Sequence, residues 1–263
     1  MSTPLLLVTN DDGIFAPGLA ALAEAMAPLG EVYVVAPDRE QSTVGHALTL
    51  HRPLRVDRLD ARRFAVNGTP SDCVNLAILG LLPSEPKLVV SWINHGSNLG
   101  DDVTYSGTVS AAMEGTLLGV PSLALSLAAS EQGDFVEAGR IARLLGARTL
   151  VEGLPPKTLL NVNVPAGRPK GIRFTRLGHR VYKEKITEET DPRGKTYYWI
   201  GAGPPLWENR ESTDVVAVQD GYASVTPLHL DLTHYEALRG LGEWEAALNA
   251  QLRSRRCSPG SGG

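Results

Sequence analysis

Short apolar runs alternate with helical patterns through the first half of the sequence. The apolar runs are hydrophobic on both faces, as expected for strands buried in a mainly parallel sheet. They lie at residues 5–9, 32–36, 64–66, 88–93 and 122–127. Strands that alternate with helices predict an α/β protein with a Rossmann-like, doubly wound, mainly parallel sheet and helices on both of its faces.

Three helices are predicted between these strands, and a fourth follows the last of them. The first opens at Pro17-Gly18, keeps its apolar residues at helical spacing, and is expected to end on a left-handed cap at Gly30. The second follows Thr69-Pro70, where a capping residue precedes a proline of the first turn. The third begins near Thr108, and the fourth covers residues 135–145.

Beyond residue 155 the rhythm changes. Residues 159–164 still have the pattern of a strand. In residues 173–199 polar and aromatic residues alternate, and Asp191-Pro192-Arg193-Gly194 has the sequence of a tight turn. This pattern predicts a protruding β-hairpin arm, which cannot bury both of its faces alone and is therefore expected to pack on another subunit. A terminal helix near residues 238–252 is expected to do the same.

These patterns predict a single α/β domain over residues 1–255. Within it we expect a core over residues 1–165, the hairpin arm over residues 172–204 and a C-terminal segment over residues 205–255. The arm and the terminal helix are assigned to oligomerisation. The glycine- and serine-rich tail, residues 256–263, is expected to be disordered.

Composition and charge narrow the class of partner. The net charge is −4, and no basic block is longer than two residues, as at Arg62-Arg63. Nucleic acid and membrane are therefore not expected partners, whereas a small phosphorylated substrate needs positive charge only locally. The first residues show neither a basic region nor a small-residue cleavage site, so no secretory signal is expected, and no apolar run approaches the ~20 residues that span a bilayer. The two cysteines suggest neither a disulfide framework nor a metal cluster. We expect a cytoplasmic protein.

Three polar loops directly follow predicted strands: residues 10–13, residues 37–42 and residues 94–98. In an open parallel sheet, ligands bind beyond the carboxyl ends of the strands. We therefore expect these three loops to meet at one edge of the sheet and to carry the chemistry.

The loop Asn10-Asp11-Asp12-Gly13 has two interpretations. The same residues make an ordinary tight turn, in which Asp and Asn bond their own backbone and Gly supplies a positive φ. A metal site is favoured here because the loop follows a buried strand, because two adjacent carboxylates repel each other without a cation, and because other oxygen donors are predicted nearby. Asp11 and Asp12 are therefore the candidate metal ligands and the candidate catalytic residues.

The donors indicate which metal is expected. Asp11, Asp12, the hydroxyl of Ser42 and the amide oxygen of Asn94 form a hard, all-oxygen ligand set, which suits magnesium, manganese or calcium better than zinc. The six histidines show no ligand spacing. His46 and His95 fall inside or beside the loops and are candidates for supporting or phosphate contacts.

The segment 105–112 is a hydroxyl-rich turn that enters a helix. Ser106 or Thr108 would serve as an ordinary N-cap, worth ~1 kcal/mol. A helix N-terminus also binds anions, and a flanking Gly107 lets a phosphate approach. Beside a metal the phosphate interpretation is the stronger of the two.

Six motifs in order over residues 8–109 resemble the survival protein SurE family. They are Val8-Thr9-Asn10-Asp11-Asp12-Gly13-Ile14 with Ala16-Pro17-Gly18, Val35-Ala36-Pro37-Asp38-Arg39-Glu40-Gln41-Ser42, Gly45-His46 with Leu48-Thr49-Leu50, Gly68-Thr69-Pro70-Ser71-Asp72-Cys73-Val74, Asn94-His95-Gly96-Ser97-Asn98-Leu99-Gly100 and Tyr105-Ser106-Gly107-Thr108-Val109. Residues 197–203 and 221–228 are similar too, so the resemblance covers nearly the whole chain.

The resemblance implies a metal-dependent 5′-nucleotidase that releases phosphate from nucleoside 5′-monophosphates, with one Mg²⁺ or Mn²⁺ per subunit and an arm used in homodimers or homotetramers. Matched by motif, the metal ligands are again Asp11, Asp12, Ser42 and Asn94. The implied phosphate-binding residues are Asn98, Gly96, Ser106, Gly107 and Thr108. Two departures are Trp92, where the family has glycine, and Thr43, near a frequent Gly or Ala. Trp92 would either narrow the pocket or be accommodated elsewhere along its strand.

These residues predict attack on the phosphate by a metal-activated water, with either aspartate able to take its proton. The same site would also suit an exopolyphosphatase, a broad-specificity phosphatase or a nuclease. A receiver-type signalling module also pairs acids after its first strand, but it needs an aspartate where Asn67-Gly68-Thr69 stands. A nucleotide-binding protein without turnover is the remaining alternative.

Overall fold

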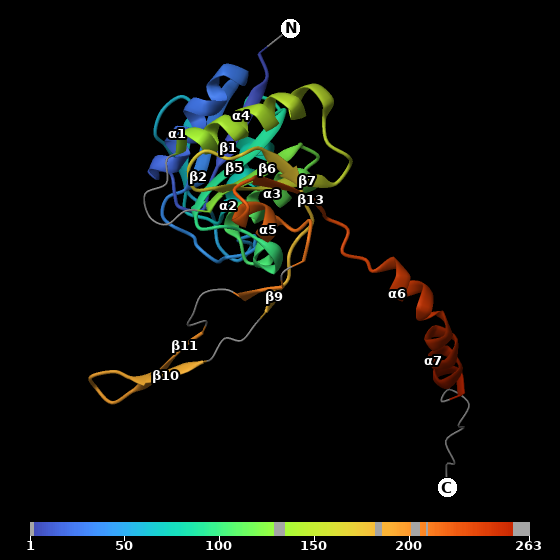
Figure 1. Cartoon of the computed structure of the whole chain (residues 1–263). Helices are drawn as coiled ribbons and strands as arrows, with labels where there is room; N and C mark the ends of the chain where they lie inside the picture. The colour runs from blue at the N-terminus through green and yellow to red at the C-terminus, as the bar shows by residue number, and fades with distance from the viewer. Residues whose placement is uncertain (1–2, 129–134, 182–185, 201–205, 209, 255–263) are drawn as a thin grey trace. The chain divides into compact units, whose positions relative to one another are not determined.

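The computed structural model describes residues 3–128, 135–181, 186–200, 206–208 and 210–254, without the side chains of residues 93–95 and 254 (Figure 1). The chain divides into two units, Met1–His229 and Leu230–Gly263. The predicted tail, residues 256–263, lies outside the described residues.

The first unit is built on a nine-stranded sheet in the order β3-β4-β2-β1-β5-β6-β7-β13-β8. The strands from β4 to β7 along this order are all parallel, while β3 and β13 run antiparallel to their neighbours β4 and β7. The predicted mainly parallel sheet is confirmed. The strands are β1 (Leu5–Thr9), β2 (Glu31–Pro37), β3 (Val56–Arg58), β4 (Arg63–Val66), β5 (Leu88–His95), β6 (Ser122–Ala128), β7 (Thr158–Pro165), β8 (Ile172–Phe174) and β13 (Ala223–His229).

Helices cover both faces of this sheet. Successive side chains of a strand point to opposite faces, and here both sets are apolar, so each face must be buried. Leu6 and Val8 of β1 pack in a cluster with α1 (Pro17–Met26) and α4 (Phe135–Glu152). Leu7 packs in a second cluster, on the other face, with α2 (Pro70–Leu76) and its π-helical extension η2 (Ala77–Leu81). Ala111 of α3 (Gly107–Leu117) joins that second cluster. Figure 1 shows α1 beside α4, away from α2 and α3.

The crossover through α4 has the opposite hand to the crossover through α3. Both connections move one strand in the same direction, from β5 to β6 and from β6 to β7. They pass over opposite faces, because α3 packs with α2 whereas α4 packs with α1. Right-handed crossovers are the rule in parallel sheets. The crossover through α3 shares its hand with those through α1 and α2, so the one through α4 is the exception.

The first predicted helix ends differently from the expectation. After α1 the chain makes a short 3₁₀ turn, η1 (Ala27–Leu29), and Gly30 has an extended backbone with φ 173 rather than a left-handed cap. A Cβ at Gly30 would lie 2.2 Å from the carbonyl oxygen of Pro4. Close approach of the chain to the start of β1 therefore explains this glycine. The predicted left-handed cap is wrong.

The arm region contains short strand pairs outside the main sheet. β10 (Thr187–Thr190) pairs with β11 (Thr196–Trp199) around the predicted turn, where the Gly194 N–H donates to Asp191 O at 2.9 Å. β9 (Arg180–Val181) pairs with β12 (Leu206–Trp207). Along the chain α5 (Asp214–Gln219) follows β12, and it packs on β13 and β7.

Among its described residues the second unit holds two helices, where one was predicted. They are α6 (Tyr235–Gly240) and α7 (Gly242–Ser254), separated at Leu241. The glycines that flank Leu241 weaken helix continuity, because glycine loses the most backbone freedom in a helix. No described helix of the chain is both long enough and apolar enough to cross a membrane.

Candidate active site at the carboxyl ends of the central strands

The loops after β1 and β2 are joined by backbone hydrogen bonds. The Gln41 N–H donates to Asp11 O at 2.8 Å, and the Ile14 N–H donates to Pro37 O at 2.8 Å. From β1 the chain crosses to β2 on one side, and β5 later takes the place on the other side of β1. Asp11 thus follows a strand at the switch point of the sheet, the usual ligand site of open α/β folds.

Asn10 shapes the loop that carries the two aspartates. Its side chain is fully buried, donates from Nδ2 to Gly13 O at 3.0 Å and accepts from the Gly13 N–H at 3.2 Å. Gly13 has φ +101, and a Cβ there would come within 3.1 Å of the Arg39 backbone. The Asn10 side chain therefore closes the loop onto the Gly13 backbone, and Asp11 and Asp12 lie between these two residues.

The electrostatics of the two aspartates favour a cation. Asp11 is almost fully buried, and this burial raises the pKa of its carboxyl group. The hydrogen bond from Thr108 lowers that pKa, but by less. Burial also raises the pKa of Asp12 to about 7, with smaller contributions from Asp11 and Glu40. Within the described residues, neither carboxylate has a cationic side chain at ion-pair distance. A divalent cation fits this pair because it would supply the missing positive charge.

The described chain contains no group of three histidine, cysteine or acidic side chains that could hold a metal. The predicted ligand set needs only two carboxylates, completed by a hydroxyl and an amide. Ser42 lines the same cavity as Asp11, and its hydroxyl donates to Glu40 Oε1 at 2.5 Å. The backbone of Asn94 pairs with Ser126 at the end of β5, but its side chain and that of His95 lie outside the described residues.

The N-terminus of α3 lies directly against Asp11. A Cβ on Gly107 would be 2.8 Å from Asp11 Cβ and 2.9 Å from its Oδ2. The Thr108 hydroxyl is fully buried and donates to Asp11 Oδ1 at 2.8 Å, and Ser106 caps the helix by accepting from the Val109 N–H at 3.1 Å. Thr108 therefore orients the carboxylate, and its predicted contact with phosphate stays a prediction.

Asn98 is held by side chains of two neighbouring strands. Its backbone N–H donates to Asn163 Oδ1 at 2.8 Å, and its Nδ2 donates to Ser126 Oγ at 2.7 Å. The partly buried Gly96 lies on the same loop with φ +134, a conformation that favours glycine. Both residues follow β5, so the third predicted loop also reaches this edge of the sheet.

One cavity of about 300 Å³ joins these parts. That volume lies at the small end of the range for small-molecule sites. Arg180, at the base of the arm, lines this cavity and donates from Nη1 to Asp102 Oδ1 at 2.7 Å. Neither Arg180 nor Tyr105 was singled out as a site residue from the sequence. The lining residues are Asp11, Ser42, Thr43, Ser97, Asn98, Asp102, Tyr105, Ser106, Gly107 and Arg180.

The structure also shows the surroundings of three further residues that the sequence analysis singled out. His46 bonds Glu114 of α3, with its Nε2 2.8 Å from Oε2, and thus ties the loop after Ser42 to α3. Trp92 is fully buried in the cluster beneath α1 and α4, so the indole is accommodated in the core. Thr43 has φ +56, which is strained for a β-branched residue beside Ser42.

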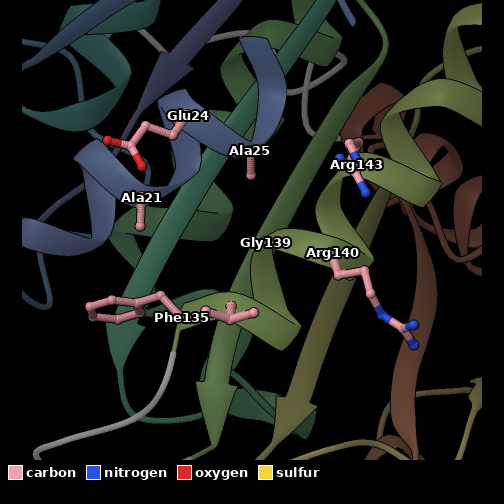
Figure 2. Close-up of a pocket in the computed structure, with 8 residues that line it drawn as sticks. Ala21, Glu24, Ala25, Phe135, Gly139, Arg140 and Arg143 are labelled. Carbon is pink, nitrogen blue, oxygen red and sulfur yellow. The ribbon is translucent and has the colours of Figure 1, made fainter. Parts of the chain in front are cut away.

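A larger cavity, of about 670 Å³, lies between α1 and α4 (Figure 2). Figure 2 shows Glu24 of α1 and Arg140 and Arg143 of α4 around it. None of the predicted site residues lines this cavity.

The fold and the cavity define a class of protein: a doubly wound α/β protein with adjacent carboxylates at the switch point of its sheet. The family model described as survival protein SurE matches residues 6–184, and the chain belongs to that family.

Relatives and a solved structure are similar over most of the chain. A 5′-nucleotidase SurE from Syntrophotalea carbinolica is 56% identical over 242 residues, which cover 91% of this chain and 97% of the relative. A 5′-nucleotidase SurE from Myxococcus xanthus is 53% identical over 243 residues, covering 91% and 93%. The crystal structure of the SurE protein from Aquifex aeolicus matches with a TM-score of 0.84 and 48% identity, covering 92% of this chain and all of that one.

Proposed function

We propose that this chain is a metal-dependent 5′-nucleotidase, which releases phosphate from nucleoside 5′-monophosphates. The observation that carries the proposal is one cavity in which Asp11 and Ser42 meet Asn98, Ser106 and Gly107. Carboxylate and hydroxyl oxygens lie beside a helix N-terminus there, so groups that suit a cation adjoin groups that suit a phosphate. Relatives named 5′-nucleotidase SurE, more than half identical over most of the chain, support the same activity.

Asp11, Asp12, Ser42 and Asn94 would hold one Mg²⁺ or Mn²⁺ per subunit. A bound divalent cation polarises a phosphoryl oxygen and lowers the pKa of a water molecule. Thr108 and the peptide N–H groups near Asp11 keep its carboxylate oriented toward the cavity. One of the two aspartates accepts the proton of the attacking water.

The other side of the cavity binds the phosphate. Asn98 and the turn 106–108 supply the amide and N–H donors, and the dipole of α3 adds positive potential where negative charge builds up. Gly107 and Gly96 lack side chains that would hinder a phosphoryl group. Because these donors are fixed before the substrate arrives, they stabilise the transition state without reorganising.

A substrate panel tests the proposal. We expect the purified chain with Mn²⁺ or Mg²⁺ to show its highest kcat/KM on nucleoside 5′-monophosphates, with inorganic polyphosphate and RNA as comparison substrates. Faster release from polyphosphate would favour the alternative exopolyphosphatase on the same site. Nucleotide binding without phosphate release under any divalent metal would contradict the proposed reaction.

We further propose that the chain assembles as a homodimer or homotetramer. Trp244, Leu248 and Leu252 of α7 recur at helical spacing and are 68%, 54% and 66% exposed. Tyr198 and Trp199 of β11 are also exposed. Apolar faces of this kind mark protein contacts, and the second unit has no apolar core of its own among the described residues.

The molar mass in solution tests the assembly. We expect light scattering to give a multiple of the subunit mass for the wild-type protein, and Trp244→Glu to lower it. Asn249→Glu, which adds the same charge on a different side of α7, is the matched control. A monomeric wild-type protein at micromolar concentration would contradict the proposed assembly.

A further inference from the structure

Two asparagine side chains of β7 form hydrogen bonds with the backbone of Asn98. Asn163 accepts the Asn98 N–H on Oδ1 at 2.8 Å and donates from Nδ2 to the Asn98 carbonyl at 3.0 Å. Asn161 donates from Nδ2 to the same carbonyl at 2.9 Å. Both asparagines are fully buried. Together they satisfy the backbone of Asn98 as a neighbouring strand would.

The side chain of Asn98 is braced separately by β6. Its Nδ2 donates to Ser126 Oγ at 2.7 Å, and the Ser126 side chain is buried. One of the two amide hydrogens is used in this bond, and Asn98 also lines the cavity that contains Asp11 and Ser106. Backbone and side chain of Asn98 are thus fixed from two directions at the edge of the cavity.

Burying two amide side chains at these positions of β7 lowers the stability of the fold unless all their polar atoms are hydrogen-bonded. Val162 and Val164, which alternate with the asparagines, pack in the apolar cluster on the α1 and α4 side. Asn161 and Asn163 therefore point to the opposite face of the sheet. Asn161 Oδ1 is buried and has no hydrogen-bond partner among the described residues, which costs stability. Local features that cost stability concentrate at functional sites.

We propose that Asn163, assisted by Asn161 and Ser126, is a positioning residue that holds Asn98 in place to bind the phosphate of the substrate. The proposal rests on the proposed function, because it takes Asn98 as a phosphate contact. Among the described residues, the side chain of Asn163 bonds only to the backbone of Asn98, so it acts through that residue. It is expected to affect phosphate binding and leave the metal ligands undisturbed.

Asn163→Asp and Ser126→Ala test this role. Asn163→Asp keeps an acceptor for the Asn98 N–H but turns a carboxylate oxygen toward the Asn98 carbonyl. We expect kcat/KM on a nucleoside monophosphate to fall roughly 10- to 100-fold, because small misplacements of binding groups cost that much. The dissociation constant of orthovanadate, a phosphate mimic, should rise by a similar factor, while that of Mn²⁺ stays within about twofold of the wild type. Ser126→Ala, the smaller change, should weaken vanadate binding less.

Thr116→Val is the matched control. It removes a buried hydroxyl that donates to Ala112 O at 2.9 Å, in the second half of α3, and should leave vanadate binding unchanged. The positioning role is overturned if both Asn163→Asp and Ser126→Ala bind vanadate as the wild type does, or if Mn²⁺ and vanadate binding fall together. A wild-type protein that releases no phosphate would defeat the proposed function, whereas vanadate binding would still decide the role of Asn163.

Discussion

Asp12→Asn is expected to lower phosphate release from a nucleoside 5′-monophosphate by at least about 100-fold, because it removes a charged ligand from the proposed cation site. Without metal, the variant should be no less stable than the wild type. The Asp12 carboxylate forms no ion pair among the described residues, and Asp11 and Glu40 repel its negative charge. Steady-state kinetics with Mn²⁺ or Mg²⁺, together with thermal unfolding in chelator, would measure both effects.

Asp57→Asn is the control for this change. Asp57 is an exposed residue of β3, and the same loss of one carboxylate there should leave kcat/KM within about twofold of the wild type. An Asp12→Asn protein that folds and keeps near wild-type activity with either metal would show that the metal assignment is wrong.

Gly107→Ala is expected to have the second largest effect. The added Cβ would lie 2.8 Å from Asp11 Cβ, so either the N-terminus of α3 or the carboxylate must move by several tenths of an ångström. Both groups line the cavity, and a misplacement of about 1 Å costs about 100-fold in rate, so a smaller shift should cost somewhat less. We expect kcat to fall by roughly 10- to 100-fold, measured on protein shown to be folded by thermal denaturation.

Gly115→Ala separates this local effect from general overpacking. A Cβ on Gly115, in the same helix, would lie 2.5 Å from Ser122 Oγ and 2.9 Å from Val89 Cγ2. This substitution should cost about 1–3 kcal/mol of stability. The folded protein should nevertheless keep its kcat, because neither neighbour lines the cavity. Equal losses of kcat in the two variants would argue against a specific role for the Gly107 and Asp11 contact.

The sheet and its carboxyl edge could be predicted because they depend on local patterns. Runs that are apolar on both faces occur in buried parallel strands, and loops that follow such strands meet at one edge. The loops of Asp11 and Ser42 were expected to meet, and backbone hydrogen bonds join them in the structure. Trp92 could be assigned to neither pocket nor core until its position relative to the helices was known.

Other parts of the site depend on contacts between residues distant in the sequence. Thr108 lies 97 residues from Asp11, and Asn163 lies 65 residues from Asn98. A serine or threonine at a helix start is explained equally well as a cap, so its sequence context does not identify the carboxylate it bonds. The asparagines of β7 did leave a signal, because polar residues on one face of a strand expected to be buried on both faces need partners.

The most direct test of the account is the metal dependence of phosphate release. The full chain would be treated with chelator, dialysed, and assayed on a nucleoside 5′-monophosphate before and after Mn²⁺ or Mg²⁺ is restored. We predict that the chelated protein is inactive, that either cation restores the rate, and that Asp12→Asn protein is not restored. Full activity of the chelated wild-type protein would contradict a cation held by Asp11 and Asp12.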